Sequence, residues 1–184
     1  MPRPILNAIA ALLPLLATAC DAGQPPPDAS LSTRSTTMEP SVTYLHLLKH
    51  TPFFTNLTTG QLRWVIGHSH EWEARAGTVV AERDGNAASG AQDRAIWILL
   101  DGGWQLEAAG HTYPADHASA GKWFSAAMTD RLCRLVTTEH SYVMKIERAD
   151  FDAMLAQGFA FGPHIDAGRH YYGELFAAPV SLAQ

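Results

Sequence analysis

The hydrophobic pattern changes to a period of two at His70, and this change constrains the fold more than any other feature. Apolar and polar residues alternate over His70–Ala76, as expected for a strand with one buried face. Further short strands are expected at Thr78–Glu82, Ala95–Leu100, Trp104–Leu106, His111–Tyr113, Cys133–Thr137 and Tyr142–Ile146. Turn signals separate several of them, at Gly77, Asp101-Gly102 and Gly110. Short strands punctuated by glycine predict an all-β barrel or sandwich.

Helical patterns flank these strands, which a generic small barrel does not explain. We expect a short amphipathic helix over Val42–His50 and a second one marked by Leu57, Leu62 and Val65, with Thr58 or Thr59 as its N-cap. Two further helices are expected after the strands, at Ala149–Leu155 and Ile165–Leu175. The tryptophans occupy core positions of the pattern and are predicted to be buried: Trp64, Trp72, Trp97, Trp104 and Trp123.

The N-terminus has the pattern of a signal peptide, predicted to span residues 1–19. A single basic residue, Arg3, precedes the apolar run Ile5–Ala17, which is short for a membrane span. The run Leu16-Ala17-Thr18-Ala19-Cys20 is similar to a bacterial lipobox, although Ala17 stands where that motif usually has leucine. We therefore expect lipidation at Cys20 and an anchor on the periplasmic face of the bacterial cell envelope. Cleavage after Ala19 without lipidation is the alternative and would yield a secreted or periplasmic soluble protein.

The segment that follows is rich in proline, serine and threonine and poor in large apolar residues, so residues 20–41 are predicted to be a flexible tether. The predicted globular domain then covers residues 42–156, and residues 157–184 form a helical extension. The net charge of −5 and the scattered basic residues exclude a broad nucleic-acid surface. Besides Cys20 the chain has only Cys133, which is expected to be a small buried residue within a strand.

The order of these signals resembles that of cyclic-nucleotide-binding domains. The matching segments are Leu47–Phe54 with Leu57 and Leu62, Gly77–Val80, Trp97–Trp104, Gly121–Phe124 and Tyr142–Phe151. The resemblance implies a mainly β fold: a small β-roll, or jelly-roll barrel, with flanking N- and C-terminal helices. It also implies that the C-terminal helix responds to ligand and can contact a protein partner.

The phosphate-binding cassette departs from that family. Members that bind nucleotide have Phe-Gly-Glu at the start of the cassette helix, whose free amides hold the phosphate, and the glutamate accepts from the ribose. Here Phe124-Ser125-Ala126 takes that place, so the carboxylate is missing, and the segment before Arg131 is short. Arg131 stands where the phosphate-binding arginine would fall, and Arg134 is the other candidate. We expect these five residues to mark the ligand position.

A metal site is an alternative. His68 and His70 stand two residues apart, with His111, His117 or His140 as a possible third ligand, as in cupin-like metalloenzymes. The cupin spacing of a later carboxylate and an upstream glycine is not matched, so no metal and no cofactor are expected.

The sequence therefore predicts a non-catalytic ligand-binding or regulatory module at the membrane. Its expected ligand is a cyclic nucleotide or another small anion, although the altered cassette argues against the family's usual ligand. A structural interaction domain of the envelope with a collapsed pocket is the third hypothesis.

Overall fold

The computed structural model describes residues 39–40, 45–85 and 94–177 of the chain. The predicted signal peptide, Cys20 and the expected loop Asn86–Asp93 lie outside this part. Of the predicted tether only Glu39–Pro40 is described, as the short strand β1, which pairs antiparallel with β2. In the described residues no helix is both long enough and apolar enough to cross a membrane.

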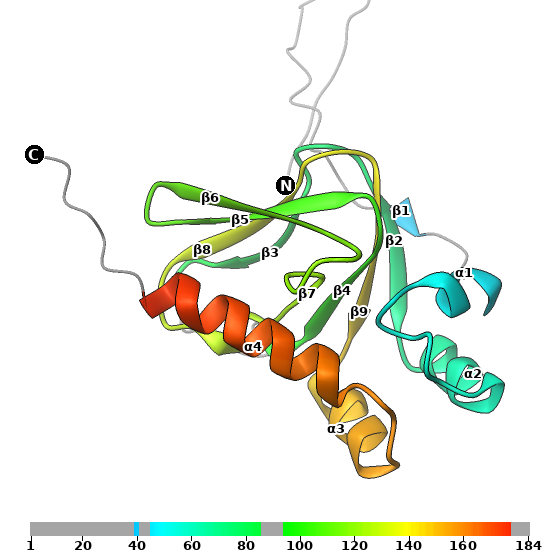
Figure 1. Ribbon diagram of the computed structural model, residues 1–184. Helices are drawn as coiled ribbons and strands as arrows, with labels where there is room; N and C mark the ends of the chain where they lie inside the picture. The colour runs from blue at the N-terminus through cyan, green and yellow to red at the C-terminus, as the bar shows by residue number, and fades with distance from the viewer. Residues whose placement is uncertain (1–38, 41–44, 86–93, 178–184) are drawn as a thin grey trace, which may run out of the picture. The chain divides into compact units, whose positions relative to one another are not determined.

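The strands form two antiparallel sheets (Figure 1). One has the order β1-β2-β9-β4-β7 and the other β3-β8-β5-β6. Their bounds are β2 His70–Ala74, β3 Val79–Arg83, β4 Ile96–Asp101, β5 Gly103–Ala108, β6 His111–Asp116, β7 Trp123–Phe124, β8 Cys133–Thr137 and β9 Ser141–Ile146. The predicted strands are confirmed with shifts of a few residues at their ends. The two-residue strand β7 was not predicted, because two residues are too few to show a period.

The four α-helices of the described residues flank the strands, as predicted. They are α1 Leu45–His50, α2 Thr59–Gly67, α3 Arg148–Ala156 and α4 Gly162–Ala177. A short 3-10 helix, η3, covers Ala126–Met128. Thr58 is the N-cap of α2: its Oγ1 accepts a hydrogen bond from the backbone N of Gln61, while the Gln61 side chain accepts from the backbone N of Thr58.

Two hydrophobic clusters lie on opposite faces of β4. Ile96, Ile98 and Leu100 join the cluster formed with the helices, while Trp97 and Leu99 join the cluster inside the roll. Because both faces of the strand are covered, its sequence is a continuous apolar run without alternation. Of the five tryptophans predicted to be core residues, Trp97, Trp104 and Trp123 are buried. The other two, Trp64 and Trp72, are half-buried at the edges of these clusters.

The alternation predicted for His70–Ala76 is wrong in detail. Within β2, His70 is exposed and Glu71 is buried. Glu71 stands opposite Met144 of β9, which belongs to the helix-covered cluster. The face that the pattern marks as polar is thus covered at Glu71, whereas Glu73 on the same face is exposed. The burial of Glu71 is a tertiary effect that the local pattern does not indicate.

The edge strand β6 extends further than predicted, to Asp116, and contains Pro114. A proline is tolerated there because an edge strand has one side without a ladder partner. The tight turn predicted at Asp101-Gly102 is confirmed: Gly102 has φ +87°, in the left-handed region that favours glycine. Cys133 lies in β8 and is buried, as expected.

Candidate functional site

The cassette position lies between β7 and β8. Phe124 ends β7, Ser125 precedes η3, and Ala126 begins it. All three side chains are buried, with exposed fractions of 0%, 2% and 3%. The residues that stand in place of Phe-Gly-Glu are therefore part of the packed interior.

The two arginines of the predicted site lie elsewhere. Arg131 is exposed, and among the described residues its guanidinium has no ion-pair or hydrogen-bond partner; only its backbone N donates, to Thr129 Oγ1 at 3.0 Å. Arg134 is also exposed, because its strand neighbours Cys133 and Leu135 face the interior and successive strand residues alternate. The structure thus brings Phe124, Ser125 and Ala126 together but not the arginines with them, and a ligand role for the five remains a prediction.

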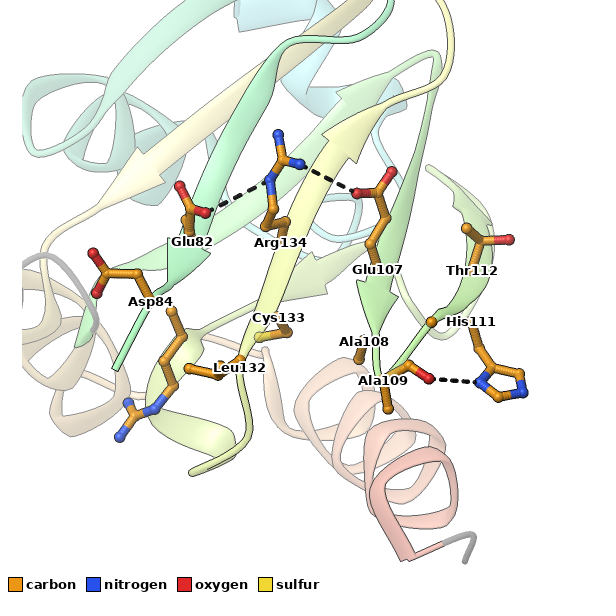
Figure 2. A pocket seen from close by; sticks show the side chains of 12 residues that line it. Glu82, Asp84, Glu107, Ala108, Ala109, His111, Thr112, Leu132, Cys133 and Arg134 are labelled. Atoms are coloured by element: carbon orange, nitrogen blue, oxygen red, sulfur yellow. Dashed lines mark hydrogen bonds and ion pairs between the residues drawn. The ribbon is translucent and has the colours of Figure 1, made fainter. Parts of the chain in front are cut away.

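Arg134 is flanked by two carboxylates on the outer face of its sheet. Its Nε lies 3.6 Å from Oε1 of Glu82 on β3, and its Nη1 lies 3.7 Å from Oε2 of Glu107 on β5 (Figure 2). These groups and the exposed Leu132 border an open pocket of about 590 Å³. The neighbouring carboxylates offset the charge of the guanidinium, so this pocket is poorly suited to an anion.

The interior of the roll beside the cassette is filled by three aromatic side chains. Trp104 of β5, Phe124 of β7 and Tyr172 of α4 are all buried in one cluster. The hydroxyl of Tyr172 and Nε1 of Trp104 both donate to the backbone oxygen of Gly121, at 3.1 Å and 2.9 Å. The rings of Phe124 and Tyr172 pack edge to face with centroids 5.4 Å apart. Burial raises the pKa of Tyr172 far above its ordinary value, so the phenol stays protonated and can donate.

A further arginine, which sequence reasoning missed, holds the cassette. Arg83 at the end of β3 donates from Nη1 to the backbone oxygen of Ala126 at 3.3 Å, and its Nη2 lies 3.3 Å from Oδ1 of Asp130. A hydrogen bond from a charged donor is stronger than one between neutral groups. The contact joins residues 43 positions apart, and no local motif could have indicated it.

A buried cation lies next to β7. Lys122 is 7% exposed, and its Nζ donates to the backbone oxygens of Ser119 at 3.0 Å and Ala118 at 3.3 Å. Desolvation lowers the pKa of Lys122, while the nearby charge of Asp116 opposes that shift. The same lysine affects α4. The pKa of His164 is lowered first by desolvation and then by the charge of Lys122, and a hydrogen bond that the His164 ring donates to the backbone oxygen of Pro52 opposes this shift.

The histidines of the metal hypothesis have separate partners. Nδ1 of His68 lies 2.8 Å from the backbone oxygen of Trp64, and its ring stacks on that indole. Nε2 of His140 lies 2.6 Å from Oε1 of Glu73. Within the described residues no group of three His, Cys, Asp or Glu side chains could hold a metal ion. In this part of the chain, no set of side chains could serve as the metal ligands that the cupin-like alternative requires.

The sequence matches no protein-family model. It matches no curated protein either. Solved structures do show a likeness. The cAMP-bound PfPKA-R superposes with a TM-score of 0.53 at 14% identity over 72% of this chain, which corresponds to 46% of that protein, less than half its length.

Two shorter structures are covered almost completely. PKAR CBD2 with Sp-2Cl-cAMPS bound gives a TM-score of 0.52 at 14% identity, over 72% of this chain and 88% of that one. A putative cyclic nucleotide-binding protein from Geobacter metallireducens gives a TM-score of 0.50 at 18% sequence identity, over 71% of this chain and 95% of that one. The fold is therefore the β-roll of cyclic-nucleotide-binding domains with flanking helices, which confirms the predicted fold class.

Proposed function

We propose that this chain is a non-catalytic regulatory module with the cyclic-nucleotide-binding fold that does not use the roll interior as a nucleotide receptor. The observation that carries the proposal is the packed interior, where Trp104, Phe124 and Tyr172 are buried in one cluster and the rings of Phe124 and Tyr172 are in contact. A nucleotide could enter only if Tyr172 left its place and its hydrogen bond to Gly121 were broken.

The polar groups around the cassette support the same proposal. Ala126 supplies no carboxylate for a ribose. Arg131 is exposed, and the guanidinium of Arg134 lies on the outer face of its sheet beside Glu82 and Glu107. Recognition of a cyclic phosphate relies on a charge-assisted contact within a closed site. The cassette of this chain is instead held by Arg83, which makes an internal contact to Ala126.

A thermal-shift titration of the full chain with cAMP and with cGMP tests the proposal. A ligand that binds the folded state raises the melting temperature as its concentration rises. We expect no concentration-dependent rise with either nucleotide. A rise that disappears in Arg131→Ala but persists in Arg63→Ala, an exposed arginine on α2, would refute the proposal and restore the family's usual ligand.

We further propose that the module acts through a protein partner that contacts α4. This helix inserts Tyr172 into the roll, whereas Arg169, His170 and Glu174 lie on its exposed face. A partner that binds the exposed face would therefore also change how firmly the roll is closed. Cross-linking from a photoreactive residue introduced at His170 tests this proposal, and recovery of no partner beyond the level of an introduced residue at Arg63 would contradict it.

The location is a separate proposal that rests on the sequence Leu16–Cys20. We propose that Cys20 carries a lipid that holds the chain on the periplasmic face of the bacterial envelope. Cys20→Ser is expected to move the protein from the membrane fraction to the soluble fraction after expression in a bacterium with the lipoprotein pathway. If wild type is itself soluble and processed after Ala19, the alternative of a secreted or periplasmic soluble protein holds.

A further inference from the structure

A second cavity lies beside η3, and Tyr172 of the packed interior is among its lining residues. It has a volume of about 390 Å³ and is bounded by β4, η3, α3 and α4. This volume falls within the range of small-molecule sites, roughly 300–1,000 Å³. Its apolar wall includes Ile96, Met128, Phe151, Leu155, Ile165 and Phe176. Leu155 is one of the two large apolar side chains exposed among the described residues, so part of this wall faces solvent.

The charged residues that line the cavity are all positive. Arg148 of α3 and Arg169 of α4 border the cavity, and no carboxylate is among its lining residues. This is unexpected in a chain with a net charge of −5. Among the described residues, the carboxylate beside each guanidinium belongs to the same helix: Nε of Arg148 lies 2.9 Å and 3.0 Å from the two carboxylate oxygens of Asp152, and Nη1 of Arg169 lies 3.9 Å from Oδ1 of Asp166. Neither guanidinium lies between carboxylates of two neighbouring strands, as that of Arg134 does. Both arginines thus retain N–H groups that can donate to a ligand.

A buried hydroxyl also belongs to this wall. Ser125 lines the cavity, is 2% exposed, and its Oγ has no hydrogen-bond partner among the described residues. A buried polar atom without a partner destabilises a fold, so its presence needs an explanation. Its Oγ has almost no accessible surface, so a ligand in the cavity would supply the missing partner once the hydroxyl turned toward it.

We propose that this cavity binds an amphipathic carboxylate, an apolar chain or ring that carries one carboxylate group. The apolar body would lie against Phe151 and Ile165, while the carboxylate would accept hydrogen bonds from Arg148 and Arg169 and, where it reaches, from Ser125. A planar guanidinium matches a carboxylate in shape as well as in charge. A ligand here contacts η3, α3 and α4 together, so it would stabilise the docked position of α4.

Isothermal titration calorimetry of the full chain tests the proposal, with octanoate as the chain probe and 2-naphthoate as the ring probe. Octanol has the apolar body without the charge, and acetate has the charge without the body. We expect at least one of the two carboxylates to bind and both controls to fail; which one binds identifies the apolar body. Equal binding of octanol, or no binding of either carboxylate, would overturn the proposal.

Four variants locate the binding. Arg148→Gln and Arg169→Gln are each expected to weaken it by about tenfold, as the loss of a charged hydrogen bond does, whereas Arg63→Gln on α2 should leave it unchanged. Gly173→Leu is expected to abolish binding, because Gly173 lines the cavity and no heavy atom lies within 4 Å of a Cβ built there. Far-UV circular dichroism verifies that each variant is folded.

Ser125→Ala separates a ligand role from a structural one. The hydroxyl has no partner to lose, so the variant should melt at a higher temperature than wild type without ligand, and yet it should bind the carboxylate more weakly. A lower melting temperature with unchanged affinity would show that Ser125 is a structural residue. Unchanged affinity in both arginine variants would overturn the site itself. The nucleotide titration of the proposed function has no part in these outcomes, so either proposal can fail alone.

Discussion

Gly168 of α4 lies directly against the indole of Trp123, and no side chain fits between the two residues. A Cβ built at Gly168 would lie 2.6 Å from Cε2 of Trp123. Nε1 of the same indole donates a hydrogen bond to the backbone oxygen of His164 at 2.8 Å. This close approach seats α4 (orange to red in Figure 1) against β7. One helical turn after Gly168, Tyr172 enters the interior of the roll.

Replacement of Gly168 tests this arrangement. Gly168→Ala should lower the free energy of unfolding by about 1–3 kcal/mol, because the added methyl group overpacks the contact with Trp123. Gly173→Ala is the matched control on the same helix: it has open space and should stabilise by up to about 1 kcal/mol through helix propensity. Urea denaturation of both variants measures the difference. Equal stability of the two would show that α4 does not depend on this contact.

The phenol of Tyr172 is the second test of the closed interior. Tyr172→Phe should lower the free energy of unfolding by about 0.5–1.5 kcal/mol, the usual net value of one hydrogen bond, since Gly121 keeps its bond from Trp104. Tyr171→Phe is the control, because that hydroxyl makes only a long contact of 3.5 Å to Pro114. Denaturation at neutral pH compares them. A larger loss in Tyr171→Phe would contradict the assignment.

His164 should make stability depend on mild acid. Burial lowers the pKa of His164, so the unfolded chain binds a proton more readily than the folded chain does. The contribution of neutral His164 to the free energy of unfolding is fully present above the ordinary histidine pKa, about 6.5. This contribution is lost as the pH falls toward the lower pKa that His164 has in the folded chain. His164→Gln should flatten this part of the curve of unfolding free energy against pH. His170→Gln, an exposed site on the same helix, should not, and an unchanged slope in His164→Gln would contradict the prediction.

The arginines near the cassette should differ in their effect on stability. Arg83→Gln removes the contacts to Ala126 and Asp130 and should lower the free energy of unfolding by about 1 kcal/mol. Arg131→Gln is expected to change it by less than about 0.5 kcal/mol, as is usual for an exposed side chain. Thermal denaturation measures both. The reverse order would mean that Arg131, not Arg83, holds η3.

Much of the fold could be predicted from local patterns. The change of period at His70, the turn at Asp101-Gly102 and the helical segments on both sides follow from steric preference and hydrophobic alternation, which neighbouring residues determine. Their order along the chain was sufficient to indicate the β-roll. The sequence predicts Thr58 or Thr59 as the N-cap of α2. The reciprocal hydrogen bonds between Thr58 and Gln61 show that Thr58 is the N-cap.

The sequence by itself also determined that Ala126, and not an acidic residue, follows Ser125 at the predicted cassette position. Only the tertiary structure decided what occupies the interior. Tyr172 is 51 residues from Gly121, and Arg83 is 43 residues from Ala126, so each contact depends on how separate elements pack. The same holds for the cavity that Arg148 and Arg169 border. A local pattern indicates which face of an element is apolar. Which other element packs against that face depends on the packing of the whole chain.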